Sequence, residues 1–129
     1  MQDRKILVVY NTCGIRGDNT NWYIQCLESI LNQKFSGFRV VLSSCLNSKE
    51  CIAEIVKKFR NTISYSIHSE PHTVNMTFNK AVQDAVTEFG EFESYIYVDS
   101  GCFFDNNVNI LSNLYETYKQ TNAEMIAVQ

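Results

Sequence analysis

Residues 6–12 read Ile-Leu-Val-Val-Tyr-Asn-Thr, an unbroken apolar and aromatic run that ends in two polar side chains. A run with no polar position on either face is typical of a strand that helices cover on both sides, as happens in parallel sheets. The sequence therefore predicts a buried strand over Ile6–Tyr10. Asn11 and Thr12 then stand at the carboxyl end of that strand.

The rest of the chain alternates between short apolar runs and apolar residues at helical spacing, in the order β-α-β-α-β-α-β-α-β. Strands that alternate with helices are the pattern of a parallel sheet with crossover helices. The sequence therefore predicts a three-layer α/β/α fold with a mainly parallel, Rossmann-like sheet. Further strands are predicted over Phe38–Leu42, Ile63–Ile67, Tyr95–Val98 and Met125–Val128.

Four helices are predicted between these strands, each from an apolar stripe. Asp18–Thr20 can cap the first helix, Ser36-Gly37 breaks it, and Gly90 ends the third. A polar turn is predicted over residues 43–47, directly after the second strand. The four stripes are Trp22, Cys26, Leu27, Ile30 and Leu31; Ile52, Ile55, Val56 and Phe59; Val74, Phe78, Ala81, Val82, Ala85, Val86 and Phe89; and Ile110, Leu111, Leu114 and Tyr118.

Composition and charge narrow the class of protein. A length of 129 residues, 45% hydrophobic and 19% charged, matches the make-up of one globular domain over residues 1–129. The net charge of −3 argues against a nucleic-acid partner, because that affinity depends on clustered cations. A polar start and a short first apolar run predict neither an export signal nor a transmembrane segment. The five cysteines form no C-x-x-C pair, which argues against a zinc site and favours reduced thiols in the cytoplasm.

Polar residues that follow the predicted strands form the candidate site, since ligands of open α/β sheets bind at the carboxyl ends of the strands. Asp99 is the sharpest of them, because a carboxylate directly after an apolar strand can hold a divalent cation that neutralises a diphosphate. Gly101 would let the backbone approach a ligand, although Asp-Ser-Gly is also a common turn sequence. The strand-end residues are Asn11, Thr12, Ser43, Ser44, His68, Asp99 and Gly101.

Two other features have both a functional and a structural interpretation. Asn75 and Asn79 share a helix face, and Asn79 beside Lys80 can meet a ribose or a phosphate. Polar residues are nevertheless ordinary on an exposed helix face. Asp105 either offers a second carboxylate or caps the helix that follows it. The sequence lacks the G-x-G-x-x-G, P-loop and G-x-S-x-G motifs, which argues against NAD, ATP and a serine-hydrolase elbow.

Four segments read VYN (residues 9–11), YIQCLESILNQ (23–33), NMTFNKA (75–81) and YIYVDSG (95–101). In this order they resemble the "TYN" start, the "YLxxCLxSILNQ" helix, the "N-x-G-x-x-x-A-x-N" region and the "YIxxLDSD" strand end of the inverting family two glycosyltransferases of the GT-A type. The helix is the most specific match. The resemblance covers nearly the whole chain and identifies it with the first half of such an enzyme, which binds the nucleotide-sugar.

The resemblance implies a hexosyltransferase-type enzyme that takes a nucleotide-diphosphate sugar, such as a UDP-sugar. The sugar would pass with inversion to a hydroxyl of a glycan or other acceptor. Mn²⁺ or Mg²⁺ would be held at Asp99. The implied donor site comprises Tyr10, Asn11, Thr12, Ser43, Ser44, Asn75, Asn79, Asp99, Ser100 and Gly101.

The chain departs from the family at three places. Gly101 stands where the family has the second acid of its D-x-D motif, and Ser43 or Ser44 replaces the acid that recognises the nucleobase. The family's catalytic base and acceptor-binding elements lie beyond the fifth strand. We therefore assign no catalytic residue and expect a truncated chain, completed by another polypeptide or by a homo-oligomer.

These departures leave an alternative, a non-catalytic nucleotide- or glycan-binding module of the same fold. A receiver-like or flavodoxin-like domain is a weaker alternative. Asn11 and Thr12 stand where a receiver has an acidic pair, and where a flavodoxin has a hydroxyl-rich phosphate loop.

Overall fold

A computed structural model describes residues 5–12, 20–45, 49–60, 62–68, 74–99, 104 and 108–121. Strands and helices alternate through these ranges, which confirms the predicted order as far as the fourth helix. The fifth strand, predicted over Met125–Val128, lies outside the described residues. The elements are β1 (Ile6–Asn11), α1 (Thr20–Leu31), β2 (Phe38–Cys45), α2 (Lys49–Lys58), β3 (Ser64–His68), α3 (Val74–Phe89), β4 (Ser94–Asp99) and α4 (Ile110–Thr121).

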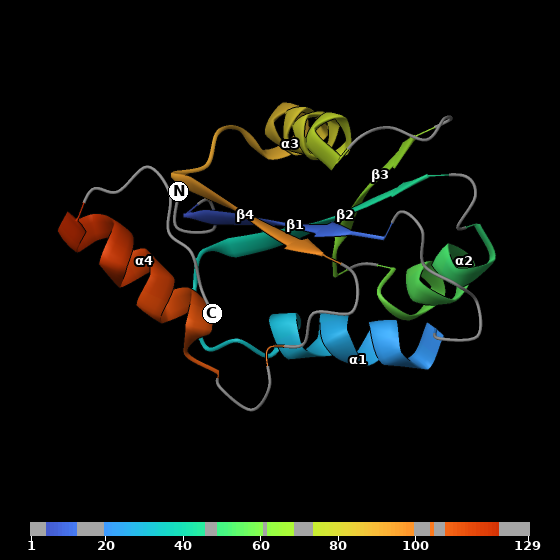
Figure 1. Cartoon of the computed structure of the whole chain (residues 1–129), viewed down its shortest axis with the longest axis horizontal. Helices are drawn as coiled ribbons and strands as arrows, with labels where there is room; N and C mark the ends of the chain where they lie inside the picture. Colours follow the sequence, from blue (N-terminus) through green and yellow to red (C-terminus); the bar gives the residue numbers. More distant parts are fainter. Residues whose placement is uncertain are drawn as a thin grey trace.

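The four strands form one sheet in the order β3-β2-β1-β4 (Figure 1). All three pairings are parallel, and β1 pairs with β2 on one side and β4 on the other. All six residues of β1 are buried. The prediction of a central strand covered on both faces, made from the apolar run alone, is therefore confirmed.

The helices lie on both faces of the sheet because the chain reverses direction across it. From β1 to β3 each step moves toward the same edge, and α1 and α2 lie on one face. From β3 the chain returns past β1 to β4, and a right-handed crossover in that direction must pass over the other face. Figure 1 shows α3 alone above the sheet, with α1, α2 and α4 below it. The α/β class and the parallel sheet are thus confirmed.

Two apolar clusters fill the spaces between the layers, because alternate strand residues point to opposite faces. Ile6, Val8 and Tyr10 pack with residues of α1, α2 and α4, including Ile55. The odd-numbered positions Leu7 and Val9 pack on the α3 side. The second cluster comprises Leu7, Val9, Val41, Ala81, Ala85 and Phe92, and the two alanines let the helix approach the sheet closely. By the same alternation, Asn11 lies on the α3 face.

The second strand runs further than its apolar residues indicate. β2 continues to Cys45, so the polar turn predicted over residues 43–45 was wrong. Ser43 pairs with Asn11 of β1 and with Ser66 of β3, and it is fully buried. Backbone pairing on both sides therefore extends the strand through side chains that by themselves favour a turn.

The start of α4 is held by a residue distant in the sequence. This helix begins at Ile110, and Asp105, predicted as either a cap or a second carboxylate, lies outside the described residues. The backbone N–H of Leu111, in the first turn, donates to Gln33 Oε1 at 3.0 Å. No helix within the described ranges is long and apolar enough to cross a membrane.

Gly90 ends α3, as the sequence predicts, with a φ of 93° and its N–H donating to Val86 O at 2.8 Å. A side chain at this left-handed φ clashes with the backbone, at a cost of about 1–2 kcal/mol. We expect Gly90→Ala to lower the free energy of unfolding in urea by that amount. The control Glu88→Ala, at an exposed helix position, should change it by less than about 0.5 kcal/mol. Equal effects would contradict the prediction.

Glu93, just before β4, fastens α4 to the sheet. Its carboxylate accepts hydrogen bonds from Lys119 Nζ at 2.7 Å and from the Tyr115 hydroxyl at 2.9 Å. The bond from Lys119, followed by that from Tyr115, holds the pKa of Glu93 below its ordinary value. A carboxyl with a lowered folded-state pKa stabilises the fold above its unfolded pKa, and this contribution is lost as the pH falls through the folded pKa.

We therefore expect Glu93→Gln to lower the midpoint of urea unfolding at pH 7 and to match the wild type at about pH 3. The difference at pH 7 should be small and should shrink in 1 M NaCl, because both charged groups are exposed. Glu91→Gln, an exposed neighbour, is the control. A difference that is constant with pH would show that the carboxylate charge is not involved.

Candidate functional site

The candidate site lies at the carboxyl ends of β1 and β4, where the order of strands reverses. One crossover leaves β1 toward β2, and the chain arrives at β4 from the opposite edge of the sheet. Ligands of open α/β sheets bind beyond the carboxyl ends of the strands, at the point where the strand order reverses. Asn11 and Asp99, the last residues of the two strands, are register partners. The structure therefore brings together two of the residues predicted from the sequence.

The Asp99 carboxylate is held by two neighbouring donors. Asn11 Nδ2 donates to Asp99 Oδ1 at 3.4 Å and to the Tyr97 hydroxyl oxygen at 3.0 Å. The Tyr97 hydroxyl in turn donates to Asp99 Oδ1 at 3.3 Å. The Asn11 side chain is buried, whereas Asp99 is exposed. The Asp99 carboxylate is thus accessible to solvent, while hydrogen bonds from Asn11 and Tyr97 fix its orientation.

Tyr97 fixes this triangle to α3. Its ring meets the ring of Phe78 edge-on, with 6.0 Å between the centroids. Aromatic pairs in this arrangement are favourable beyond the area that they bury. Asn11, Tyr97 and Asp99 are all on the α3 face by strand alternation. The carboxylate therefore lies on the α3 side of the sheet, at its carboxyl end.

Thr12 and Ser43 lock the ends of β1 and β2 together. The N–H and the hydroxyl of Thr12 both donate to the carbonyl oxygen of Ser43, at 2.8 and 2.9 Å. Both residues are fully buried. They support the strand ends from inside the fold, and their side chains are not at the surface where Asp99 is exposed.

The other residues of the predicted donor site are distributed differently. Tyr10 is fully buried in the core on the α1 face, and Ser44 is buried and points to that face by alternation. Asn79 is exposed on α3. The side chains of Asn75 and His68, and the residues Ser100, Gly101 and Asp105, lie outside the described residues.

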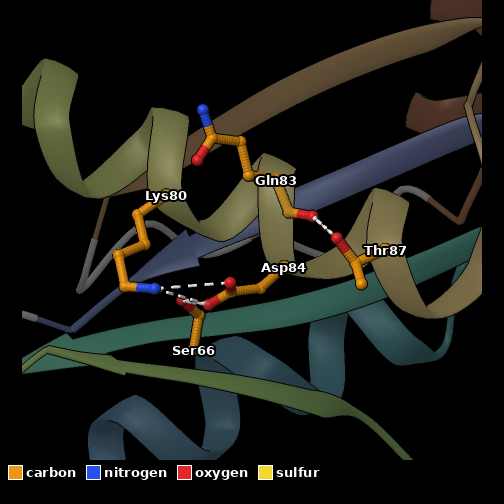
Figure 2. A network of polar contacts seen from close by, with 5 residues as sticks. All are labelled: Ser66, Lys80, Gln83, Asp84 and Thr87. Carbon is orange, nitrogen blue, oxygen red and sulfur yellow. Dashed lines mark hydrogen bonds and ion pairs between the residues drawn. The ribbon is translucent and has the colours of Figure 1, made fainter.

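Asn79 was predicted, beside Lys80, to meet a ribose or a phosphate. Lys80 has a partner at the other edge of the sheet. Its Nζ lies 3.4 Å from both carboxylate oxygens of Asp84, and the Ser66 hydroxyl donates to Asp84 Oδ2 at 2.6 Å (Figure 2). Ser66 belongs to β3, which is the opposite edge strand from β4. This network fastens α3 to β3.

Sequence reasoning missed two buried polar residues, Ser29 and Gln33. Each bonds to the backbone of the chain that follows β4. The available signal was their position: each interrupts the apolar pattern of the first helix and its end, inside the segment most similar to the glycosyltransferase helix.

The carboxylate of Asp99 can bind a hard cation if phosphates of a ligand supply further oxygen atoms. Within the described parts of the chain, no three His, Cys, Asp or Glu side chains are close enough to hold a metal ion. Asp99 thus offers one carboxylate. Mg²⁺ is commonly bound by one or two carboxylates together with substrate phosphates and water. One oriented, exposed carboxylate fits that mode of binding.

No protein-family model matches this chain, and no curated protein matches it. The interpretation of the site therefore depends on its residues and their geometry.

The contact between Asn11 and Asp99 can be tested by adding a charge. Asn11→Asp replaces the donor at 3.4 Å with a second carboxylate. We expect the free energy of unfolding at pH 7 and low salt to fall by at least about 1 kcal/mol, because a hydrogen bond becomes a repulsion between like charges. Mn²⁺ should restore more stability to this variant than to the wild type, since a cation can bridge two carboxylates.

Asn11→Ala is the matched control, because it removes the hydrogen bond without adding a charge. Its stability should not be restored by Mn²⁺. Urea unfolding with Mn²⁺ and with EDTA measures both effects. If Asn11→Asp responds to Mn²⁺ no more than Asn11→Ala does, the two side chains do not face one another.

Proposed function

We propose that the chain binds a nucleotide-diphosphate sugar at the carboxyl ends of β1 and β4, as the donor-binding part of an inverting glycosyltransferase of the GT-A type. The observation that carries this proposal is the exposed Asp99 carboxylate, oriented by Asn11 and Tyr97 where the strand order reverses. The sequence resemblance independently points to the same carboxylate. The parallel sheet with helices on both faces is compatible with such an enzyme.

The proposed chemistry is displacement at the anomeric carbon, with a nucleoside diphosphate as the leaving group. When bound, Mn²⁺ or Mg²⁺ supplies positive charge that stabilises the leaving diphosphate. Asp99 would hold the cation. The Asn11 amide and the Tyr97 hydroxyl, which both donate to Oδ1, would keep the carboxylate in one orientation.

The acceptor hydroxyl would need a general base within hydrogen-bond reach. We assign none among the described residues. In the family that the sequence resembles, this group lies beyond the fifth strand.

The alternative function is a non-catalytic nucleotide- or glycan-binding module. Two observations favour it. Gly101 occupies the place of the second metal-binding acid, and Ser43, at the place of the acid that would recognise the nucleobase, is neutral and fully buried. On this alternative a nucleotide would bind through backbone and neutral groups, without a cation.

Calorimetric titration with UDP and a UDP-sugar, in Mn²⁺ and in EDTA, tests the proposal. We expect binding that requires Mn²⁺ and that Asp99→Asn weakens at least about 10-fold, which corresponds to about 1.4 kcal/mol. The substitution keeps the size of the side chain and its capacity to accept a hydrogen bond, and it removes the charge. Glu88→Gln, which neutralises an exposed carboxylate on α3, should bind as the wild type does.

The outcomes separate the two functions. Binding that is indifferent to Mn²⁺ and to Asp99→Asn would support the non-catalytic module. If neither UDP nor other nucleoside diphosphates and their sugars bind under either condition, both proposals are wrong.

A further inference from the structure

The end of α1 carries two buried polar side chains that bond to a distant part of the chain. Ser29 is 9% exposed and Gln33 is 6% exposed. Leaving a polar group buried without a partner costs about 1–3 kcal/mol, so each needs a hydrogen bond. Both find one in the segment between β4 and the first turn of α4, more than 70 residues further along the chain.

Ser29 fixes the position of Phe104. Its hydroxyl donates to the carbonyl oxygen of Cys26 at 2.6 Å, which leaves the oxygen to accept the N–H of Phe104 at 3.0 Å. The Phe104 side chain is partly buried against the core on the same face. The backbone at Phe104 is thus held by a polar contact and by apolar packing.

Gln33 fixes the start of α4. The first N–H groups of a helix have no acceptor within the helix, and Gln33 Oε1 accepts one of them, the N–H of Leu111, at 3.0 Å. Only the carbonyl end of the side-chain amide can accept, so this donor determines which way Gln33 points. Next to it, the N–H of Lys34 donates to the carbonyl oxygen of Val108 at 2.8 Å.

Together Ser29, Gln33 and Lys34 form what we call the α1 clasp. The clasp holds the chain at Phe104, Val108 and Leu111, and the first of these points follows Asp99 by five residues. A five-residue step spans at most about 18 Å when fully extended. Phe104 therefore lies within that distance of Asp99.

We propose that Ser29 and Gln33 are positioning residues for the cation and diphosphate site at Asp99, although neither touches that site. Asp99 is oriented by Asn11 and Tyr97, and the clasp holds Phe104, five residues further along the chain. The part of this inference that concerns a ligand depends on the proposed function. The part that concerns the chain after β4 does not.

Apolar residues at these two positions would pack against the core on the α1 face, but they would leave the N–H groups of Phe104 and Leu111 without these acceptors. The two side chains thus supply hydrogen-bond acceptors directed at specific backbone N–H groups. Groups that hydrogen-bond directly to a metal ligand typically change metal affinity by about 10- to 100-fold when they are replaced. The clasp acts on Asp99 through the chain, so we expect an effect at the lower end of this range. Each replacement also removes a buried hydrogen bond, so affinity and stability are measured separately.

The test compares Ser29→Ala and Gln33→Met with two further variants. Gln33→Glu keeps an acceptor oxygen at the start of α4, where the helix dipole also favours a negative charge, so it should behave as the wild type does. Ser66→Ala is the matched control, since it removes one hydrogen bond of another buried serine, on the far edge of the sheet. Calorimetry with Mn²⁺ and UDP measures affinity, and urea unfolding measures stability.

We expect Ser29→Ala and Gln33→Met to weaken Mn²⁺-dependent UDP binding by about 10-fold, at temperatures where all variants are folded. Ser66→Ala should bind as the wild type does even where its stability falls by as much. The proposal is overturned if Ser29→Ala and Gln33→Met retain full affinity, or if Ser66→Ala weakens binding to the same degree.

Amide hydrogen exchange of the ligand-free protein gives a readout that does not depend on UDP. Ser29→Ala and Gln33→Met should accelerate exchange in peptides that cover residues 100–111 and leave β1 and β2 unchanged. Exchange that rises uniformly, or not at all, contradicts the clasp. If exchange changes as expected but the wild type binds no nucleotide, the proposed function fails while the role of the clasp in holding this segment stands.

Discussion

The structure depends on the burial of β1 between two parallel neighbours and two layers of helices. Every residue of β1 is buried, and its register with β2 and β4 aligns the three carboxyl ends. Because a shift by one residue would turn each side chain to the opposite face, the two apolar clusters fix this register from both sides. The meeting of Asn11 and Asp99 is a consequence of that register and not of local sequence.

Asn11 and Asp99 meet at the point where the order of strands reverses. The right-handed crossovers place α3 on one face of the sheet and α1, α2 and α4 on the other. Tyr97 packs on Phe78 of α3, and Asn11 extends from β1, so two elements on either side of the reversal orient one carboxylate. The site is thus assembled by the topology, with each strand contributing its last residues.

The sequence predicted those features that depend on local pattern. The apolar run of β1, the four helices and the end of α3 at Gly90 are found where the pattern places them, although Trp22 of the first predicted stripe is exposed. The strand end at Asp99 followed from the same pattern, and only its partners required the structure. What the sequence could not predict are contacts between distant residues. The extension of β2 through Ser43 depends on pairing with two other strands. The capping of α4 by Gln33 spans 78 residues, whereas the prediction looked for a cap among neighbours such as Asp105.

A row of polar side chains crosses the four strands near their carboxyl ends, next to the apolar interior of the sheet. Asp99, Asn11, Ser43 and Ser66 are successive register partners on the four strands. Two residues earlier on β4, β1 and β2, and on the same face, stand Tyr97, Val9 and Val41, so the change from apolar packing to polar groups takes about 7 Å along the strands. Burying Asn11, Ser43 and Ser66 does not strengthen a sheet, because such groups must be paired merely to offset the loss of water. They are paired at both ends of the row, by Asp99 and Tyr97 on one side and by Asp84 on the other. The exposed end of this row is the Asp99 carboxylate, which the register with β1 places beside the buried Asn11.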